Sequence, residues 1–528
     1  MSHSRRERIH QEIQFYCLAL MAVGLPLSMF LMSVSTILLS LNWLAWGNFR
    51  QRLTTLCTNK AALIFLVIFA MHILGGLYSS DMDFYADDLR IKLPLLAYPI
   101  ILGSTPALDT ERIRRLMWLY IAALVLSTLV CLVIYLGLTS REVNDFRDLS
   151  PFISHIRLSL LICVGISWLA SVVLTTQRPL YKLGFSVLIA WLIFSLNLLQ
   201  SATGFVILGV FVAVCCFLLL WKIRNTWLRF SLLALLIVVP SVYLVDFVND
   251  YFRKDEFDLA ELDKTTLSGT LYTHSPEETV TENGHLVFIY VAYDEMEREW
   301  PKRSALSLDS TLPGDLNLQA CLIRYLTSKN LRKDSAGIAA LSDDDVRSIE
   351  KGETNYRYVN QSIGKRIYVI LQEFDLYYHY GEMNGSSVIQ RFEYLKTGWH
   401  IARSHPFFGV GTGDLRQAFN QQYETDRSQL HPKFRLRAHN QYLSIAIGFG
   451  FVGLAIFLFC LIYPAVLTRS YRLMVFNGFL ITALVSFLSE DTLETQAGVS
   501  FFIFFYGLFV WARKSARSGP LAIANRQS

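Results

Sequence analysis

Long apolar runs are the feature that most constrains what this chain can fold into. About twelve of them recur, centred near residues 20, 38, 70, 97, 127, 166, 190, 211, 238, 452, 482 and 504. Each is long enough, or nearly so, to cross the roughly 30 Å hydrocarbon core of a bilayer as a helix. The runs predict an all-α polytopic membrane protein with about twelve transmembrane helices.

The composition agrees with this interpretation. Of the 528 residues, 53% are hydrophobic and 17% are charged, whereas an average soluble domain has about 25% charged residues. A mean hydropathy of +0.37 excludes a disordered chain and argues against a single soluble globule. Eight cysteines are too few for a disulfide scaffold in a chain of this length.

The basic residues predict the orientation of the runs. If the N-terminus is cytoplasmic, 20 Lys and Arg residues fall in cytoplasmic segments and five in the short outer loops. Cytoplasmic loops of membrane proteins carry such an excess. We therefore expect a multi-pass membrane protein with both termini in the cytoplasm.

One segment, residues 249–438, contains no apolar run and is expected outside the cell membrane by the same parity. We expect transmembrane helices in residues 1–248 and 439–513, and a cytoplasmic tail at 514–528. Within the outer segment, residues 249–390 have 15 basic and 24 acidic residues, while residues 391–438 have 8 basic and 4 acidic. Helices are expected at 317–328, 343–350 and 362–378, and a strand at 286–292. The segment is thus a large, mostly α insertion whose last part suits an anionic ligand.

His439 and Asn440 stand where the chain re-enters the membrane. Residues 439, 442, 446, 450 and 453 would share one face of a helix, with Gly450 and Gly453 allowing close helix packing. The result would be a rigid post with an imidazole at its outer end, suited to a general base. A histidine at the membrane interface with glycines serving only packing is the alternative.

Two further motifs precede His439. Arg391 lies near the start of a predicted helix that Ser386 and Ser387 cap, beside an apolar stripe of Val388, Phe392, Leu395 and Trp399. Its guanidinium could bind phosphate, or it could be a solvated surface group. Gly411 and Gly413 lie in a glycine-rich loop before a helix. Such a loop can hold phosphate through backbone N–H groups, or it can be a plain turn.

Charged residues also gather at the outer ends of the apolar runs. Charges at that depth are costly unless they are paired or used. They could form a functional cluster, reach to the interface, or belong to an ordinary loop. These residues are Lys92, Arg157, Arg435, Arg437, Glu490, Asp491 and Glu494.

Metal binding has weak support in the sequence. Asp81 and Asp83, and the run of Asp343, Asp344 and Asp345, have a spacing that acidic loops often produce by chance. No Cys/His cluster has zinc spacing. We expect no metal site.

These motifs together resemble the O-antigen ligase and polymerase superfamily, polytopic membrane proteins with one large periplasmic loop. The resemblance rests on His439-Asn440-x9-Gly450-x2-Gly453, on Arg391-x7-Trp399 before it, and on the 405–413 segment His-Pro-Phe-Phe-Gly-Val-Gly-Thr-Gly. It is strong over residues 386–460 and looser over the rest of the chain.

The resemblance implies an inverting, metal-independent glycosyltransferase of the periplasmic face that uses no cofactor. Such ligases move a glycan from undecaprenyl pyrophosphate to a sugar hydroxyl of lipid A–core, within membrane lipids and without nucleic acid. A polymerase, with another glycan as acceptor, or a transporter of lipid-linked glycans are the alternatives.

The resemblance also implies the roles of individual residues. His439 and Arg391 correspond to the family's catalytic histidine and loop arginine. A further family arginine has no counterpart in residues 200–204, so we expect Arg157, Arg437 or Lys92 to bind pyrophosphate in its place. The other expected site residues are Gly411 and Gly413 for pyrophosphate binding, and Asn440, Glu490 and Glu494 in support.

Overall fold

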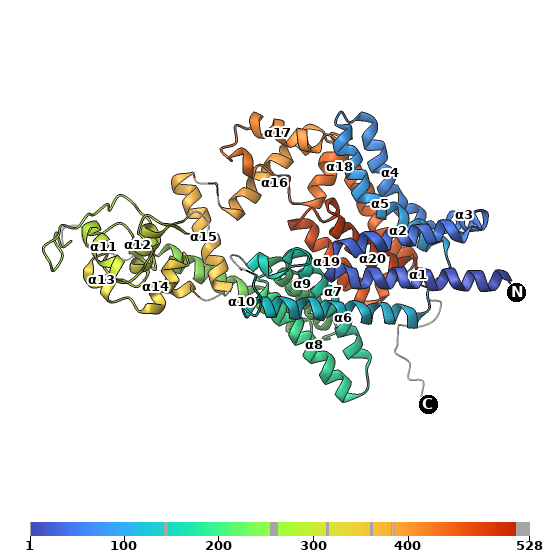
Figure 1. Ribbon diagram of the computed structural model, residues 1–528, viewed down its shortest axis with the longest axis horizontal. Coiled ribbons are helices and arrows are strands. Elements are labelled where there is room, and N and C mark those ends of the chain that lie inside the picture. Colours follow the sequence, from blue (N-terminus) through green and yellow to red (C-terminus); the bar gives the residue numbers. More distant parts are fainter. Residues whose placement is uncertain are drawn as a thin grey trace. The chain divides into compact units, whose positions relative to one another are not determined.

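The computed structural model describes residues 2–141, 146–253, 262–312, 316–359, 363–381, 383–384 and 386–513, and these are mainly helical (Figure 1). Within these residues, eight helices are long and apolar enough to cross a membrane. Seven of them lie in the first half of the chain, and one follows the insertion. They are α2 (Met29–Trp46), α4 (Lys60–Gly75) with the 3-10 turn η1 (Gly76–Tyr78) that extends it, α6 (Thr110–Tyr135), α7 (His155–Thr175), α8 (Pro179–Leu198), α9 (Ala202–Trp221), α10 (Thr226–Phe252) and α18 (Gln441–Leu467).

Four more helices lie where apolar runs were predicted. α19 (Met474–Ser489) and α20 (Gln496–Val510) are apolar but shorter. α1 (Ser2–Leu27) and α5 (Met82–Ser104) are not among the eight. A further short helix, α3 (Phe49–Thr58), connects α2 with α4. The helical membrane class is confirmed, and the number of twelve spans stays a prediction.

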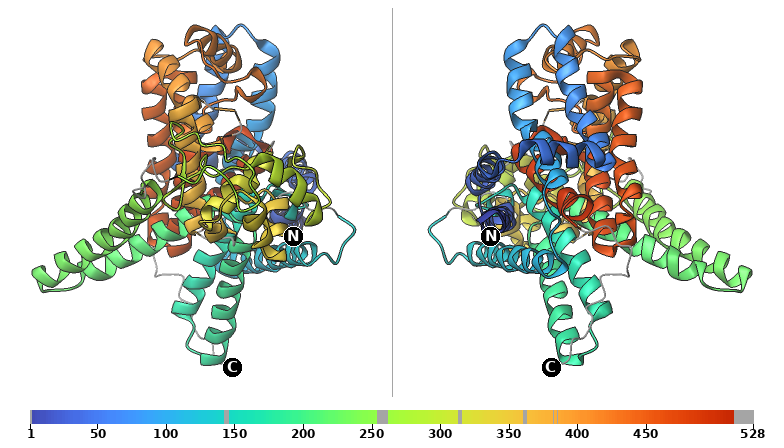
Figure 2. Two further views of the ribbon diagram at one scale, coloured as in Figure 1. Left: turned by 90° about the vertical axis from the view of Figure 1, so that its left-hand side faces the viewer. Right: turned by 90° about the vertical axis from the view of Figure 1, so that its right-hand side faces the viewer.

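The chain divides into two compact units. The first unit comprises residues 1–216, 393–428 and 435–528, and the second comprises residues 217–392 and 429–434. In the first unit α5 packs against α20, α7 against α19, and α4 against α18. Figures 1 and 2 show the blue α4 beside the orange α18, although the two are far apart in sequence.

Helix α20 is buried in the first unit and contacts other helices or loops at both of its ends. At its start, the Gln496 side chain donates to the Met29 carbonyl oxygen at 3.4 Å. Just beyond its end, the Leu108 N–H donates to the Ala512 carbonyl oxygen at 2.6 Å. Residues 498–510 of α20 are all buried, so this helix forms the centre of the unit.

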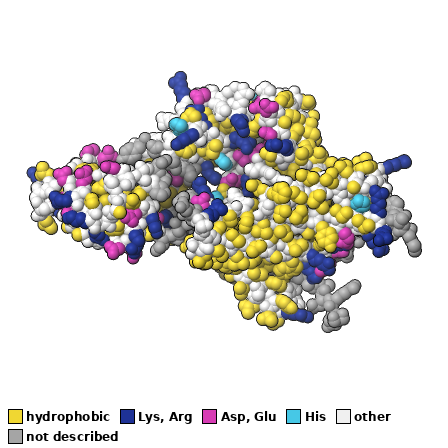
Figure 3. Space-filling model, in the orientation of Figure 1, with side chains coloured by type: hydrophobic (Ala, Val, Ile, Leu, Met, Phe, Trp, Pro, Cys, Tyr) yellow, Lys and Arg dark blue, Asp and Glu magenta, His cyan; other side chains and the backbone are white. Residues whose placement is uncertain are grey.

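Many apolar side chains of the first unit are exposed rather than buried. In Figure 3 hydrophobic side chains cover most of the visible face of α6 and α8. Leu126 of α6 and Leu183 and Val187 of α8 are each more than half exposed. A soluble protein rarely exposes apolar area on this scale, so these faces fit contact with lipid.

The second unit holds several short helices and two small sheets. Its helices are α11 (Tyr293–Glu299), α12 (Leu318–Ser328), α13 (Ser335–Ala339), α14 (Asp343–Glu350) and α15 (Ile363–Tyr380), besides α10. Strand β1 (Thr281–Glu282) pairs with β2 (His285–Leu286), and β3 (Thr311–Leu312) with β4 (Leu316–Asn317). A separate core forms around Trp300, Leu322 and Leu326.

The three helices predicted in this unit are confirmed as α12, α14 and α15. The predicted strand at 286–292 is wrong, because only Leu286 lies in a strand. Val287 and Val291 are buried in the core of the unit, and Val291 forms only isolated bridges with Thr273 and Lys333. Burial of apolar side chains, and not strand pairing, explains that apolar pattern.

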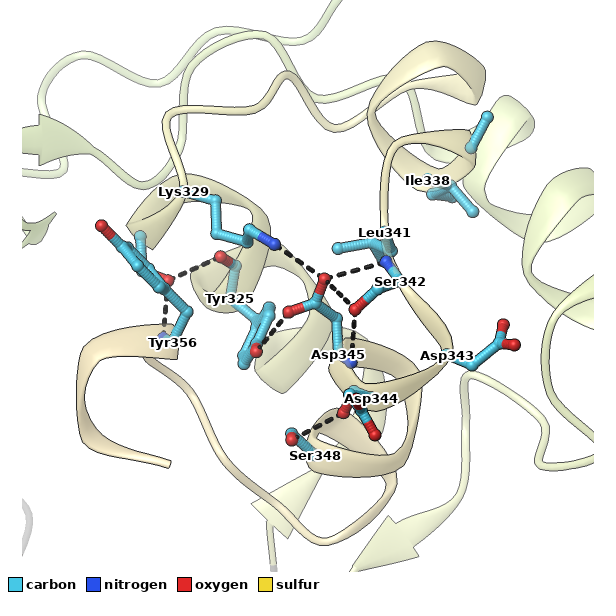
Figure 4. A network of polar contacts seen from close by, with 12 residues as sticks. Tyr325, Lys329, Ile338, Leu341, Ser342, Asp343, Asp344, Asp345, Ser348 and Tyr356 are labelled. Atoms are coloured by element: carbon cyan, nitrogen blue, oxygen red, sulfur yellow. Dashed lines mark hydrogen bonds and ion pairs between the residues drawn. The ribbon is translucent and has the colours of Figure 1, made fainter. Parts of the chain in front are cut away.

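Figure 4 shows how the acidic run at 343–345 is used. Ser342 and Asp345 form a capping box at the start of α14, with the Ser342 Oγ accepting from the Asp345 N–H at 3.2 Å. Asp345 also accepts from Tyr325 Oη and Lys329 Nζ, both at 2.7 Å. These contacts give the run a structural role.

Candidate functional site

A cavity of about 400 Å³ lies in the first unit, which we call the His439 cavity. It forms where the starts of α7, α17 (Leu415–Thr425) and α18 meet the loop between α19 and α20. Five of the predicted site residues line it. The lining residues are Arg157, Arg416, Phe419, Asn420, Arg435, Leu436, Arg437, His439, Glu490, Asp491, Glu494 and Thr495.

His439 is held in an uncommon backbone conformation at the cavity wall. Its φ is +47°, in the left-handed region that costs energy for residues other than glycine. Asn440 caps α18 by accepting from the Leu443 N–H at 2.9 Å, and it donates to the Leu488 carbonyl oxygen at 3.0 Å. The imidazole lies 5.7 Å from the Tyr394 ring, centroid to centroid. The strained turn therefore fixes the imidazole just before the start of α18.

Glu494 joins the cavity to a buried charge cluster. Its carboxylate accepts from Lys92 Nζ at 2.9 Å and from Gln441 Nε2 at 3.0 Å, and it pairs with Arg437 Nη1 at 3.4 Å. Lys92 is 1% exposed and also pairs with Asp88. Because a buried charge is costly without partners, this cluster fixes the positions of its members.

Arg157 and Asp491 are held by hydrogen bonds at the loop between α19 and α20. Arg157 Nη1 donates to Thr492 Oγ1 at 3.3 Å, and Ser444 Oγ donates to Asp491 Oδ1 at 2.7 Å. Burial and the nearby charge of Glu494 raise the pKa of Asp491. Burial opposes the charge of Arg437, but Glu494 and Asp491 outweigh that effect and raise its pKa. Arg437 is thus a permanent cation at the cavity.

Two more arginines complete the wall. Arg435 pairs with Glu424 and donates to the Ser428 carbonyl oxygen at 3.4 Å. Arg416 lies over the Phe84 ring, 5.1 Å from its centroid, and within the described residues it makes no ion pair. Arg416 is therefore a cation that an anionic ligand can use without breaking an existing pair.

The glycine-rich loop packs against the protein through its own backbone. The Gly411 N–H donates to the Gly448 carbonyl oxygen at 3.0 Å, and the Gly413 N–H donates to Ser79 Oγ at 2.9 Å. A Cβ on Gly413 would lie 2.4 Å from the Asp81 carbonyl oxygen. Both N–H groups predicted to bind phosphate are thus already used, which favours the packing role.

Helix α18 is not the continuous straight helix that the residue spacing predicted. Gly450 has φ +68° and ψ −180°, so the helical run breaks at this residue. The Phe451 N–H donates to the Pro406 carbonyl oxygen at 2.7 Å, and the Ile447 carbonyl oxygen accepts from the Val410 N–H at 2.8 Å. His439 also precedes the helix. The glycine-rich segment therefore pairs with the backbone groups that the break releases.

Arg391 lies on α16 (Ser387–Ser404), in the part of that helix that belongs to the second unit. Its predicted catalytic role stays a prediction. The apolar stripe of α16 faces away from the core, since Phe392 is 62% and Trp399 is 52% exposed. Tyr394 and Thr397 form the buried face instead.

Sequence reasoning missed several members of the buried cluster. Asp88 lies four residues before Lys92 on α5, and its Oδ2 is 3.3 Å from His72 Nδ1 on α4. Gln441 and Ser444 contact the carboxylates from the first turn of α18. The i, i+4 spacing of Asp88 and Lys92 inside an apolar context was a signal that could have revealed the pair.

Two carboxylates near the start of α5 accept hydrogen bonds from backbone N–H groups. Asp81 caps α5 by accepting from the Phe84 N–H at 2.9 Å, while Asp414 accepts from the Ser80 N–H at 2.8 Å. Among the described residues no group of three or more His, Cys, Asp or Glu side chains could hold a metal ion.

The fold and the cavity together define an integral membrane protein of many helices, with cations, carboxylates and a histidine collected at one cavity. Residues 337–458 match the family model described as O-antigen ligase. This match agrees with the family resemblance: the matched residues, which include Arg391, the glycine-rich loop and His439, are similar to the O-antigen ligase family. It supports a glycosyltransferase activity of O-antigen ligase or polymerase type. No curated protein matches the chain.

Proposed function

We propose that this protein is an O-antigen ligase. It moves a glycan from undecaprenyl pyrophosphate to a sugar hydroxyl of lipid A–core, with inversion at the anomeric carbon and without a metal or cofactor. The single observation that carries this proposal is the cavity that brings His439 together with Arg157, Arg416 and Arg437.

The guanidinium groups suit the leaving group of this reaction. Breaking the anomeric C–O bond builds negative charge on the pyrophosphate, and cations already in position stabilise that charge in the transition state. Arg157 and Arg437 are held by Thr492 and Glu494, so little reorganisation is needed. Lys92 acts through Glu494, because its ammonium is buried against that carboxylate. Arg391 on α16 is the further cation that the motif resemblance implies.

His439 suits the acceptor hydroxyl. Attack on the anomeric carbon requires the hydroxyl to lose a proton, and a neutral imidazole near pH 7 can accept it. The strained backbone and the N-cap of Asn440 hold the imidazole at the cavity. Glu490 and Glu494 support the site from the loop between α19 and α20.

The location of the cavity fits a lipid-linked donor. His439, Arg157 and the 490–495 loop lie at helix ends that the parity of the chain assigns to the periplasmic face. There a polyprenyl tail can stay in lipid while both glycans stay in water. Residues 249–438 are periplasmic in this proposal, and both termini are cytoplasmic, in the inner membrane.

A polymerase with the same donor is the second candidate, favoured by the same family match. Deletion of the gene separates the two, because the acceptors differ. Loss of all polymer from lipid A–core, with polymer accumulating on the lipid carrier, supports the ligase. Core capped by a single repeat unit contradicts the ligase and supports the polymerase. If the protein were a transporter instead, the purified protein would show no glycan transfer.

The chemistry is tested with His439→Ala. We expect this variant to lose transfer by about 100-fold or more, the usual contribution of a general base, while it still accumulates in the membrane. His400→Ala is the matched control, because His400 lies in the same unit outside the cavity and pairs with Asp426. Transfer by His439→Ala at the rate of the control would contradict the proposal.

A further inference from the structure

The second unit contains a larger cavity that the proposed reaction does not use. It measures about 770 Å³, within the ~300–1,000 Å³ range of small-molecule sites. Its walls come from α15, from the segment between α14 and residue 358, and from residues 384, 386, 433 and 434. All of these belong to the second unit. We call it the insertion cavity.

The rear wall of the insertion cavity is fixed by a buried ion pair. Glu282, 1% exposed, pairs with Arg324 and accepts from Tyr368 Oη at 2.7 Å and from Asn355 Nδ2 at 2.8 Å. The Tyr358 ring stacks on Tyr368 with centroids 4.5 Å apart. A wall held by so many contacts is preorganised, which lowers the cost of binding a ligand.

The lining combines aromatic rings with planar polar groups. Tyr358 and Phe434 supply apolar faces, while Asn384, Gln372 and Glu373 supply amide and carboxylate groups. Amides both donate and accept hydrogen bonds, as sugar hydroxyls do. Aromatic rings offer flat apolar area at low entropic cost. This combination fits a saccharide better than a lipid or a purely apolar ligand.

Three lysines line the same cavity although the unit is acidic. Residues 249–390, which make up most of the unit, contain 24 acidic and 15 basic residues. Lys351 and Lys365 come from this range, and Lys433 comes from the 429–434 segment of the same unit. Lys365 is paired with Glu353. Within the described residues, the ammonium groups of Lys351 and Lys433 pair with no carboxylate, and Lys433 lies over the Phe434 ring at 4.7 Å. Unpaired cations in an acidic unit point to an anionic group on the ligand.

We propose that the insertion cavity binds an oligosaccharide segment that carries a phosphate or carboxylate, with Tyr358 and Phe434 against its sugar faces and Lys351 and Lys433 beside its anionic group. The assignment of this segment to a substrate of the transfer reaction rests on the proposed function. The saccharide site itself does not, because it is separate from the His439 cavity.

The binding test uses the full chain purified in detergent and isothermal titration calorimetry. The probes are a phosphorylated core oligosaccharide freed of lipid, the same oligosaccharide after dephosphorylation, and inorganic phosphate. We expect the phosphorylated probe to bind, and the other two to bind at least tenfold more weakly. Equal binding of inorganic phosphate would show an anion site only, and no binding of the phosphorylated probe would also overturn the proposal.

Charge reversal at the cavity gives the matched comparison. Lys351→Glu with Lys433→Glu should weaken binding of the phosphorylated probe at least tenfold, and the pair of Gln substitutions should weaken it less. Lys264→Glu is the control, because Lys264 is an exposed lysine of the same unit outside the cavity. Binding by both cavity variants at the affinity of the control would overturn the proposal.

Transfer kinetics identify the substrate and separate the two proposals. A rise in the acceptor KM at unchanged kcat in the cavity variants would assign the segment to the acceptor, and a rise in the donor KM would assign it to the donor. His439→Ala should keep full binding of the probe. If it also keeps transfer, the proposed function fails while the saccharide site stands. If wild-type protein transfers but does not bind the probe, only the saccharide site fails.

Discussion

Gly450→Ala is the perturbation that tests the broken helix most directly. The backbone of Gly450, with φ +68° and ψ −180°, lies in a region that is open essentially to glycine alone. A Cβ at this position would lie 2.3 Å from the carbonyl carbon and oxygen of Phe407 and 2.7 Å from the Phe408 nitrogen. The new methyl group meets backbone atoms, which cannot rotate away.

The magnitude follows from these two effects. The disfavoured backbone region costs about 1–3 kcal/mol, and overpacking of a rigid site costs about 1–3 kcal/mol more. We therefore expect Gly450→Ala to lose about 2–6 kcal/mol of unfolding free energy. The loop at residues 406–411 should be displaced with it, since it bonds to the backbone at the break.

The assay measures the unfolding free energy of the purified protein in mixed micelles, by titrating the micelles with a denaturing detergent. Gly209→Ala is the control, because Gly209 is a helical glycine of α9 whose Cβ would meet nothing within 4 Å. Alanine there should be neutral or stabilising by up to about 1 kcal/mol. Equal stability of the two variants would refute the broken helix at Gly450.

Three further substitutions test the His439 cavity. Glu494→Gln removes the carboxylate shared by Lys92 and Arg437 and should cost about 3 kcal/mol of stability, measured by thermal unfolding; a change within error would mean that the cluster is not buried as described. Folding raises the pKa of Asp491 above the ordinary value of 3.8, so the ionised carboxylate lowers the stability of the folded protein at any pH above that value. This loss of stability disappears as the pH falls and the carboxylate is protonated in both states. Asp491→Asn should therefore gain stability relative to wild type at about pH 7 and lose that gain near about pH 4, and a gain independent of pH would contradict this. Arg416→Gln should leave stability within about 0.5 kcal/mol while raising the donor KM about tenfold, since Arg416 lines the cavity and makes no ion pair among the described residues; an unchanged KM would remove Arg416 from donor binding.

The sequence anticipated most of the long helices of this protein, and the caps that begin several helices are equally local. Asn440 before α18, Asp81 before α5 and Ser342 before α14 all cap the helices that follow them. Such caps depend on residues only a few positions apart, so a sequence pattern contains the information needed to predict them. The twelve predicted apolar runs likewise coincide with helices, because each depends on a continuous local pattern.

The candidate site was predictable in part. The sequence singled out His439, Arg157, Arg437, Glu490 and Glu494, which share one cavity. It did not reveal Arg416, or the chain of contacts from His72 through Asp88 and Lys92 to Glu494. It also assigned phosphate binding to glycines whose N–H groups are used in packing.

The sequence by itself determined the membrane class, the positions of the helices and the residue types available for chemistry. These properties follow from hydrophobicity and from interactions within a few residues. The tertiary structure alone decided that α18 breaks at Gly450, that Glu494 lies between Lys92 and Arg437, and that three lysines gather around the insertion cavity. Each of these depends on close contacts between segments far apart in the chain, where an angle at one residue and a neighbour's backbone decide the outcome together.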